Sequence, residues 1–146
     1  MPQKLPIVII DDDLDDRELL GELSQELRQD HELRYFVNGV EALRYLETTT
    51  DQPFIILCDV NMPLMNGIEL LEEIQRTPLL KQKSIPFIFL STSGDKRYVN
   101  KAYELSAQGF FQKPAEISEL KTILKLTFDF WAKCLHPHHP QVDTAE

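Results

Sequence analysis

The sequence predicts an α/β protein whose five-stranded parallel sheet is covered by helices on both faces. Short apolar runs alternate with longer stretches of helical spacing, five times along the chain. Most of the short runs are continuously apolar, which is typical of strands that are buried on both faces. Repeated βα units with right-handed crossovers produce such a doubly wound sheet. The length of 146 residues fits one domain of ordinary size.

The predicted strands share a short length and a high content of apolar residues. They are Ile7–Ile10, Leu33–Val37, Phe54–Cys58, Pro86–Leu90 and Phe110–Phe111. The second run is more polar than the others, which indicates an edge strand. A lysine-rich segment between Pro78 and Pro86 is expected to be a loop that leads into the fourth strand.

Apolar residues spaced three and four positions apart predict five helices, around residues 19–27, 42–46, 68–74, 99–105 and 117–128. Residues that commonly cap helix N-termini precede three of them. Asp13 precedes the first helix, and the pairs Asn38 with Glu41 and Asn66 with Glu69 resemble capping boxes. The five predicted strands and five helices fill residues 1–132, and residues 133–146 are expected to form a short flexible tail.

The composition excludes several classes of function. Asp and Glu number 24 against 15 Lys and Arg, so the net charge of −9 disfavours binding to nucleic acid and to anionic lipid. No apolar run approaches the ~20 residues that span a bilayer, and the N-terminus does not resemble a signal peptide. The two cysteines provide no disulfide framework, and Cys58 lies in an apolar run. We therefore expect a cytoplasmic protein with neither nucleic-acid nor membrane partners.

Polar residues follow every predicted strand, and in open parallel sheets ligands bind at that end of the strands. The residues in question are Asp11–Asp13, Asn38–Gly39, Asp59–Pro63, Ser91–Ser93 and Lys113–Pro114. Neighbouring carboxylates repel each other by ~4 kcal/mol per pair at ~4 Å with an effective dielectric constant of about 20. Mg²⁺ relieves such repulsion, while a lysine and a hydroxyl neutralise further oxygens. The set therefore fits a phosphoryl group carried on a carboxylate.

The pattern of Asp11-Asp12, Asp59 within the segment DVNMPLMNG, Ser91 and Lys113-Pro114 resembles the receiver domain of two-component response regulators. The similarity extends from about residue 5 to about residue 130. It implies a flavodoxin-like three-layer sandwich with strand order 2-1-3-4-5.

The resemblance also implies a role for each residue at the site. Asp59 would be the phosphoacceptor. Asp12, Asp59 and the backbone carbonyl of Asn61 would bind Mg²⁺ directly, and Asp11 would act through a metal-bound water. Lys113 would contact the phosphoryl group.

Two residues would form the conformational switch, namely the hydroxyl of Ser91 and the aromatic ring of Phe110. Phe110 stands where many receivers have tyrosine, so its ring lacks a hydroxyl. Thr92 is a second candidate for the hydroxyl, but Ser91 directly follows the apolar strand. Asn61 and Ser93 lie at positions that tune dephosphorylation in the family.

Several residues near the site have simpler interpretations. Asp15 and Asp16 are expected to add only negative charge to a helix start, and Asp13 either caps that helix or joins the site as an outer group. The Lys113-Pro114 peptide bond is cis in many receivers, and a cis bond here would help to aim Lys113.

The histidines are expected to lie outside the site. His136, His138 and His139 are expected in a solvated tail rather than a metal site. The segment Asp30–Glu32, which contains the remaining histidine, is expected to be a charged surface loop.

The last predicted helix carries more apolar residues than one buried face requires. The surplus includes Phe130 and Trp131, which we expect to form a surface for homodimerisation or for docking of a partner. The alternative is a helix that simply wraps its own domain. The aromatic pair resembles the end of stand-alone receivers of the phytochrome-associated type.

Together these features predict a stand-alone response regulator. A histidine kinase or a histidine phosphotransfer protein would phosphorylate Asp59 in a Mg²⁺-dependent reaction, and the signal would pass to a downstream protein by contact. Such a protein is not an enzyme, since it catalyses only its own phosphorylation and dephosphorylation. The competing hypotheses are a receiver-like adaptor that is never phosphorylated and a Mg²⁺-dependent phosphohydrolase. The hydrolase is disfavoured because Asn61 replaces the usual second aspartate two residues after Asp59.

Overall fold

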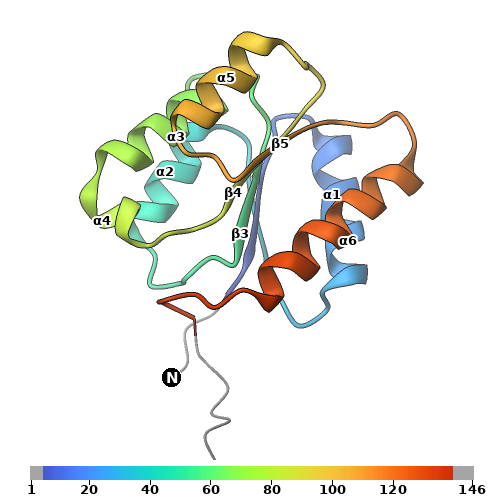
Figure 1. Ribbon diagram of the computed structural model, residues 1–146, viewed down its shortest axis with the longest axis horizontal. Helices are drawn as coiled ribbons and strands as arrows, with labels where there is room; N and C mark the ends of the chain where they lie inside the picture. Colours follow the sequence, from blue (N-terminus) through green and yellow to red (C-terminus); the bar gives the residue numbers. More distant parts are fainter. Residues whose placement is uncertain (1–4, 140–146) are drawn as a thin grey trace, which may run out of the picture.

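The computed structural model describes residues 5–139 and has a five-stranded parallel sheet at its centre (Figure 1). The strands are β1 (Ile7–Ile10), β2 (Leu33–Phe36), β3 (Ile55–Cys58), β4 (Phe87–Ser91) and β5 (Gly109–Gln112). Their spatial order is β2-β1-β3-β4-β5, and all neighbouring pairs are parallel. The predicted fold class and strand order are therefore confirmed.

Helices cover both faces of the sheet and give the molecule three layers (Figure 1). They are α1 (Leu14–Leu27), α2 (Gly39–Thr48), α3 (Gly67–Arg76), α4 (Pro78–Gln82), α5 (Lys96–Glu104) and α6 (Ile117–Lys133). Apolar side chains of α1 and α6 pack on one face, and those of α2, α3, α4 and α5 pack on the other. Two separate cores result, one on each side of the sheet.

The described residues contain six helices, so the prediction of five was wrong. The additional helix is α4, which replaces the expected lysine-rich loop. Pro78 occupies its first turn, where a missing N–H costs no hydrogen bond, and Leu80 is buried against the core of the α3 face. A helix of five residues has too few apolar positions to show a helical period.

The central strands of the sheet are fully buried. Every residue of β1, β3 and β4 is buried, whereas β2 at the edge is only partly buried. Along β1 the side chains alternate between the two cores: Ile7 and Ile9 face α1 and α6, and Val8 and Ile10 face α2 and α3. The expectation of an edge strand near residue 33 is confirmed.

Capping side chains fix where three helices begin. Asp13 accepts a hydrogen bond from the backbone N–H of Asp16, and Asn38 accepts one from that of Glu41. Asn66 and Glu69 form a full capping box, with both reciprocal hydrogen bonds present. Each cap satisfies an N–H group that the helix itself leaves unpaired. All three caps lie at the end of the sheet where the strands terminate.

The chain after α6 packs against the opposite end of the sheet, so the prediction of solvated histidines was wrong for His136. This side chain is buried, and its Nε2 lies 2.7 Å from the carbonyl oxygen of Ser84. Nε2 of His138 lies 2.7 Å from the carbonyl of Gln82, the last residue of α4. Carbonyls at a helix C-terminus lack partners within the helix, and these rings approach them. Residues 140–146 of the predicted tail lie outside the described residues.

His31 also differs from its predicted place on a surface loop. It is buried, its Nδ1 lies 2.6 Å from the carbonyl of Leu5, and its ring stacks on Phe54 with the centroids 4.4 Å apart. His139 lies 6.3 Å from the same phenyl ring and stacks on His136 at 3.9 Å. The four histidines therefore gather where the strands begin, far from the polar residues that follow them.

We expect the histidine cluster to make stability depend on pH. Burial, with smaller effects from His136, His138 and His31, lowers the pKa of His139 from 6.5 to about 4. The unfolded chain then binds a proton that the folded chain excludes, so the contribution is complete above pH 6.5 and is lost as the pH falls toward 4. Urea unfolding between these pH values should therefore show a smaller loss of stability for His139→Gln than for the wild type.

His138→Gln is the comparison variant, because this exposed side chain contributes only one of the smaller effects on His139. Its pH dependence should lie closer to that of the wild type than to that of His139→Gln. Equal slopes for the wild type and His139→Gln would contradict the prediction.

Candidate functional site

The register of the sheet brings together the residues that follow its central strands. Ile10 pairs with Cys58, so Asp11 and Asp59 occupy the next positions on neighbouring strands. The backbone N–H of Asp59 donates to the carbonyl of Ile10 at 2.9 Å, which continues the ladder by one bond. Adjacent strands lie about 4.8 Å apart, so the two carboxylates are held close together by backbone geometry alone.

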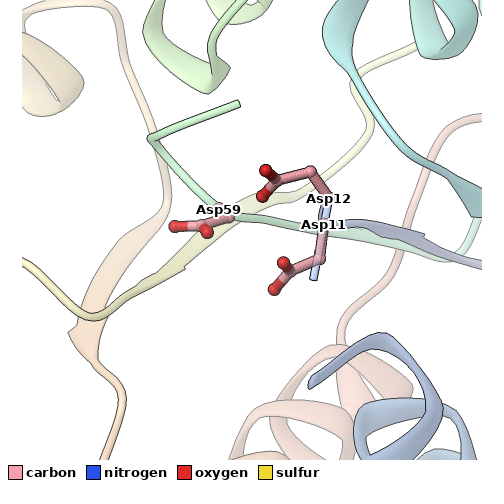
Figure 2. Close-up of side chains that lie close together, drawn as sticks. All are labelled: Asp11, Asp12 and Asp59. Carbon is pink, nitrogen blue, oxygen red and sulfur yellow. The ribbon is translucent and has the colours of Figure 1, made fainter. Parts of the chain in front are cut away.

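Three carboxylates meet at this rim (Figure 2). Oxygen atoms of Asp11, Asp12 and Asp59 all lie within 4.8 Å of one another. Asp11 and Asp59 are buried, whereas Asp12 is exposed. Oxygen donors in this number and spacing suit a hard divalent cation such as Mg²⁺, which keeps several waters besides its protein ligands. The open side at Asp12 leaves room for those further ligands.

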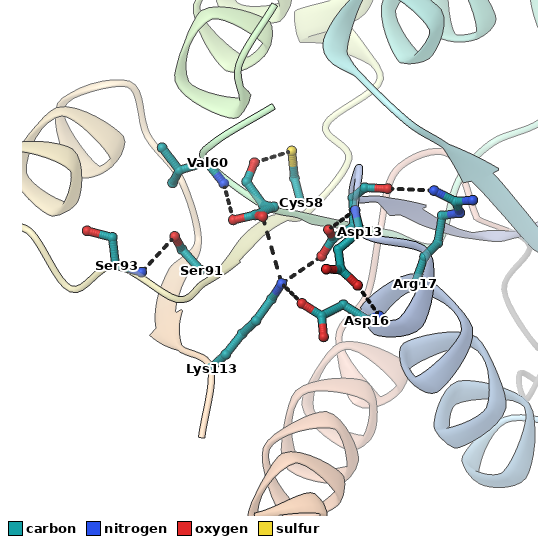
Figure 3. Close-up of polar contacts among 10 residues, drawn as sticks. Asp13, Asp16, Arg17, Cys58, Val60, Ser91, Ser93 and Lys113 are labelled. Carbon is teal, nitrogen blue, oxygen red and sulfur yellow. Dashed lines mark hydrogen bonds and ion pairs between the residues drawn. The ribbon is translucent and has the colours of Figure 1, made fainter. Parts of the chain in front are cut away.

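Lys113 reaches the cluster from the end of β5 (Figure 3). Its Nζ lies 2.7 Å from Oδ2 of Asp11, 2.8 Å from Oδ2 of Asp16 and 3.8 Å from Oδ2 of Asp59. Its backbone N–H donates to the carbonyl of Ser91 at 2.7 Å, which fixes the start of the side chain. Burial alone would lower the pKa of Lys113, but the hydrogen bonds to Asp11 and Asp16 outweigh burial and raise it. The ammonium is therefore fully charged.

The two buried carboxylates are harder to ionise than free aspartates. Burial raises the pKa of Asp59, while the charge of Lys113 and a 2.7 Å hydrogen bond from the N–H of Val60 act in the opposite direction. Burial also raises the pKa of Asp11, and the hydrogen bond from Lys113 opposes it. A second cation at the rim would stabilise both carboxylates in their charged form.

Ser91 supplies the hydroxyl nearest to the acidic cluster. Its side chain is fully buried at the end of β4, and its hydrogen bond to Asp59 lowers the pKa of that carboxyl. Thr92 is exposed, and its carbonyl accepts a hydrogen bond from the Gln112 side chain. Ser93 donates its N–H to Oγ of Ser91 at 3.2 Å. Of the two hydroxyls considered from the sequence, Ser91 is the one beside Asp59.

Phe110 lies on β5, three residues before Lys113. Its ring is partly buried on the side of α3 and α5, with its centroid 5.4 Å from that of Phe89. Phe111 points to the opposite face and packs near α6. Asn61 is exposed in the loop that follows Asp59.

The Lys113-Pro114 peptide bond is trans, as are all peptide bonds of the described residues. The expectation of a cis bond was therefore wrong. A trans X–Pro bond is favoured by about 0.5–1 kcal/mol. Lys113 reaches Asp11 and Asp16 from the trans backbone, so no cis bond is needed to aim it.

Sequence reasoning missed two residues of the first helix. Asp16 was expected only to charge the helix start, but it forms the ion pair with Lys113. Arg17 donates from Nη1 to the backbone carbonyl of Asp11 at 2.9 Å and ties α1 to the rim. Asp13 caps the helix, which was one of its two predicted roles. The available signal was the place of residue 16 in the first turn of a helix that begins directly after the acidic residues of the rim.

Gly67 allows α3 to begin directly beside Asp59. Its N–H donates to the carbonyl of Val60 at 2.9 Å, and a Cβ atom at this position would overlap the backbone carbonyl oxygen of Asp59. The helix N-terminus approaches the rim this closely only because the side chain is absent. Gly67 thus positions the central carboxylate without touching a ligand.

A doubly wound sheet with an acidic triad and a lysine at its carboxyl rim defines the class of receiver domains. The family model of the response regulator receiver domain matches residues 7–125, and the chain belongs to this family. The predicted resemblance is confirmed.

Curated relatives and solved structures agree with this assignment. The chain is 30% identical over 130 residues to response regulator Rcp1 of Synechocystis, covering 86% of this chain and 87% of that protein. It is 29% identical over 119 residues to sporulation initiation phosphotransferase F of Bacillus subtilis, covering 82% and 90%. The phosphorylated cyanobacterial phytochrome response regulator RcpA is similar at a TM-score of 0.81 and 30% identity, over 91% of this chain and 97% of that one. The Mn²⁺-bound form of Rcp1 has a TM-score of 0.79 at 29% identity, over 94% and 99%.

We expect Gly67→Ala to destabilise the protein, although alanine is normally the better helix former. The new Cβ meets a backbone oxygen that cannot turn away, so the loss should be about 1–3 kcal/mol, as for other overpacked sites. Urea unfolding measures it. Gly94→Ala is the control, because there the added atom meets the end of the flexible Gln112 side chain. Equal losses of stability in both variants would show that the start of α3 does not pack tightly against the backbone of Asp59.

Proposed function

We propose that this protein is a phosphorylation switch in which Asp59 accepts a phosphoryl group from a histidine kinase or a histidine phosphotransfer protein. The observation that carries the proposal is the environment of this residue. Asp59 is buried at the end of the central strand, within 4.8 Å of the oxygens of two further carboxylates and 3.8 Å from the ammonium of Lys113. Membership of the receiver family supports the same role.

In the proposed reaction a carboxylate oxygen of Asp59 attacks the phosphorus of a phosphohistidine. A new O–P bond forms, the P–N bond breaks, and the bonding electron pair stays on the imidazole, which takes up a proton. Positioning and charge stabilisation supply most of the catalysis in such transfers. When bound by Asp12, Asp59 and the backbone carbonyl of Asn61, with Asp11 acting through water, Mg²⁺ would supply neutralisation of negative charge.

The other rim residues would respond to the new group. Lys113 would pair with a phosphoryl oxygen, and the hydroxyl of Ser91 would donate to another. Movement of Ser91 would leave space into which Phe110 turns, so that α5, β5 and α6 shift together between two states. Asn61 and Ser93 would set how quickly water reaches the acyl phosphate. The output is then a changed surface that a downstream protein recognises.

Two competing functions fit the rim less well. An adaptor that is never phosphorylated has no need of the complete set of three carboxylates, a lysine and a buried hydroxyl, all of which are present. A phosphohydrolase acting on external substrates needs a second acid or base near the nucleophile, and the exposed Asn61 cannot serve as one. The protein would therefore act only on its own phosphorylation state.

The protein is proposed to act in the cytoplasm, through contacts with other proteins. The net charge of −9 opposes contact with nucleic acid or anionic lipid. Among the described residues, no helix has the length and apolar content needed to cross a bilayer.

Acetyl phosphate with Mg²⁺ tests the proposed reaction directly. Mass spectrometry of the intact protein should show an adduct of about 80 Da, the mass of one phosphoryl group, in the wild type and in Asp15→Asn. Asp59→Asn should show none, because the nucleophile is gone, and a chelator should prevent the reaction of the wild type. An unmodified wild type would favour the adaptor, and rapid release of phosphate from many esters would favour the hydrolase.

We further propose that α6 carries a homodimer surface. Leu126 and Phe130 expose 68% and 59% of their surface, and Phe130 meets the ring of Trp131 edge-on with centroids 5.0 Å apart. These residues border a shallow pocket with Phe111 of β5, the strand at the edge of the sheet. If α6 only covered its own domain, the apolar ring of Phe130 would stay exposed and gain no burial. A second copy related by a two-fold axis would cover this patch on both chains.

Phe130→Glu should therefore weaken self-association by about tenfold or more, since aromatic anchors dominate interfaces of this kind. Sedimentation of the wild type and the variant over a range of concentrations measures the change. Leu135→Glu is the matched control, because Leu135 is 86% exposed outside the patch. A wild type that is monomeric at every concentration would contradict the dimer.

A further inference from the structure

The ammonium of Lys113 lies closer to Asp16 than to the proposed phosphoacceptor. Nζ is 2.8 Å from Oδ2 of Asp16 but 3.8 Å from Oδ2 of Asp59 (Figure 3). Asp11 provides the other short contact, at 2.7 Å. Asp16 is not one of the three carboxylates that could share a metal ion in the described part of the chain. It therefore competes for the lysine without belonging to the acidic cluster.

The first turn of α1 holds Asp16 in this place. Its backbone N–H is bound by the carboxylate of Asp13, and the neighbouring Arg17 is bound to the carbonyl of Asp11. The helix start is thus tied to the end of β1 on both sides. Asp15 lies in the same turn but is exposed, and it makes no hydrogen bond or ion pair within the described residues. The two aspartates carry the same charge, but only the side chain of Asp16 contacts Lys113.

We propose that Asp16 is a positioning residue that holds Lys113 in a resting place and thereby favours the unphosphorylated state. This inference rests on the proposed function, in which a phosphoryl group on Asp59 becomes the partner of Lys113. Two of the three N–H donors of the ammonium already point to Asp11 and Asp16, and Nζ lies 3.8 Å from Asp59, so a short contact with a phosphoryl group there requires Nζ to move. Asp16 is the more exposed of the two short-contact partners, and we infer that its contact with Lys113 is the one that lengthens on phosphorylation.

The surroundings of Asp16 allow this exchange. Its side chain is 40% exposed, while that of Lys113 is only 11% exposed. A pocket of about 340 Å³ lies beside both residues, between α1 and the segment that leads into α6. Asp16 can turn into this space and gain water when Lys113 leaves. Its carboxylate also places one more negative charge near the incoming phosphoryl group, which disfavours the phosphorylated state further.

Removal of the carboxylate at position 16 should consequently increase phosphorylation. With acetyl phosphate and Mg²⁺, Asp16→Asn should be phosphorylated about three- to tenfold faster than the wild type, because a contact that stabilises the resting state is lost. Asp15→Asn makes the same change of charge in the same helical turn and should match the wild type. Asp16→Glu keeps the carboxylate and should restore most of the wild-type rate.

Unfolding without Mg²⁺ or phosphate donor provides a second readout. Asp16→Asn should lower the urea midpoint of the wild type, but it should leave the midpoint of a Lys113→Gln variant unchanged, because the partner is already absent. Asp15→Asn should leave both midpoints unchanged. This cycle measures the contact between Asp16 and Lys113 independently of any reaction.

The outcomes separate this inference from the proposed function. A wild type that never acquires the adduct overturns the proposed function, and with it the resting-state role of Asp16. A wild type that is phosphorylated, with Asp16→Asn and Asp15→Asn reacting at equal rates, overturns the inference alone. Slower phosphorylation of Asp16→Asn would also overturn it, since Asp16 would then assist the reaction. Equal urea effects in the presence and absence of Lys113 would show that no resting contact exists in solution.

Discussion

The balance of charge around Lys113 is the interaction on which the site depends. Asp11 and Asp59 are buried where water stabilises them poorly, and their raised pKa values record that cost. The single ammonium offsets part of it through contacts at 2.7 and 3.8 Å. A divalent cation and a phosphoryl group would each redistribute these contacts, because every carboxylate at the rim competes for the same positive charges. A site built in this way responds strongly to a single added group.

The fold places function and structural support at opposite ends of the same sheet. At the carboxyl ends of the strands, helix caps and the bare backbone of Gly67 bring α1 and α3 close to the acidic cluster. At the other end, rings of His31 and His136 lie against carbonyls that precede the strands, and Phe54 stacks with His31 between them. The carboxylates at one end lie beside the exposed Asp12, whereas the buried His31 and His136 at the other end approach backbone carbonyls.

Family membership and individual contacts carry different information about this protein. The receiver fold is shared with the family, as the match over residues 7–125 indicates. The contact between Lys113 and Asp16 and the exposed ring of Phe130 on α6 are observed in this chain. We infer that the fold and its acidic cluster govern whether a phosphoryl group is accepted, and that these two features adjust how readily it is added and what the protein binds.

The sequence alone determined the fold class and the location of the site. Continuous apolar runs require burial on both faces, and parallel strands bring the residues after them, such as Asp11 and Asp59, to one edge. Only the tertiary structure decided the remaining contacts. Lys113 and Asp16 are 97 positions apart, and His136 and Ser84 are 52 apart, so no local pattern announces either pair. Local spacing reports which face of an element is buried, but a side chain's partner depends on how distant elements pack.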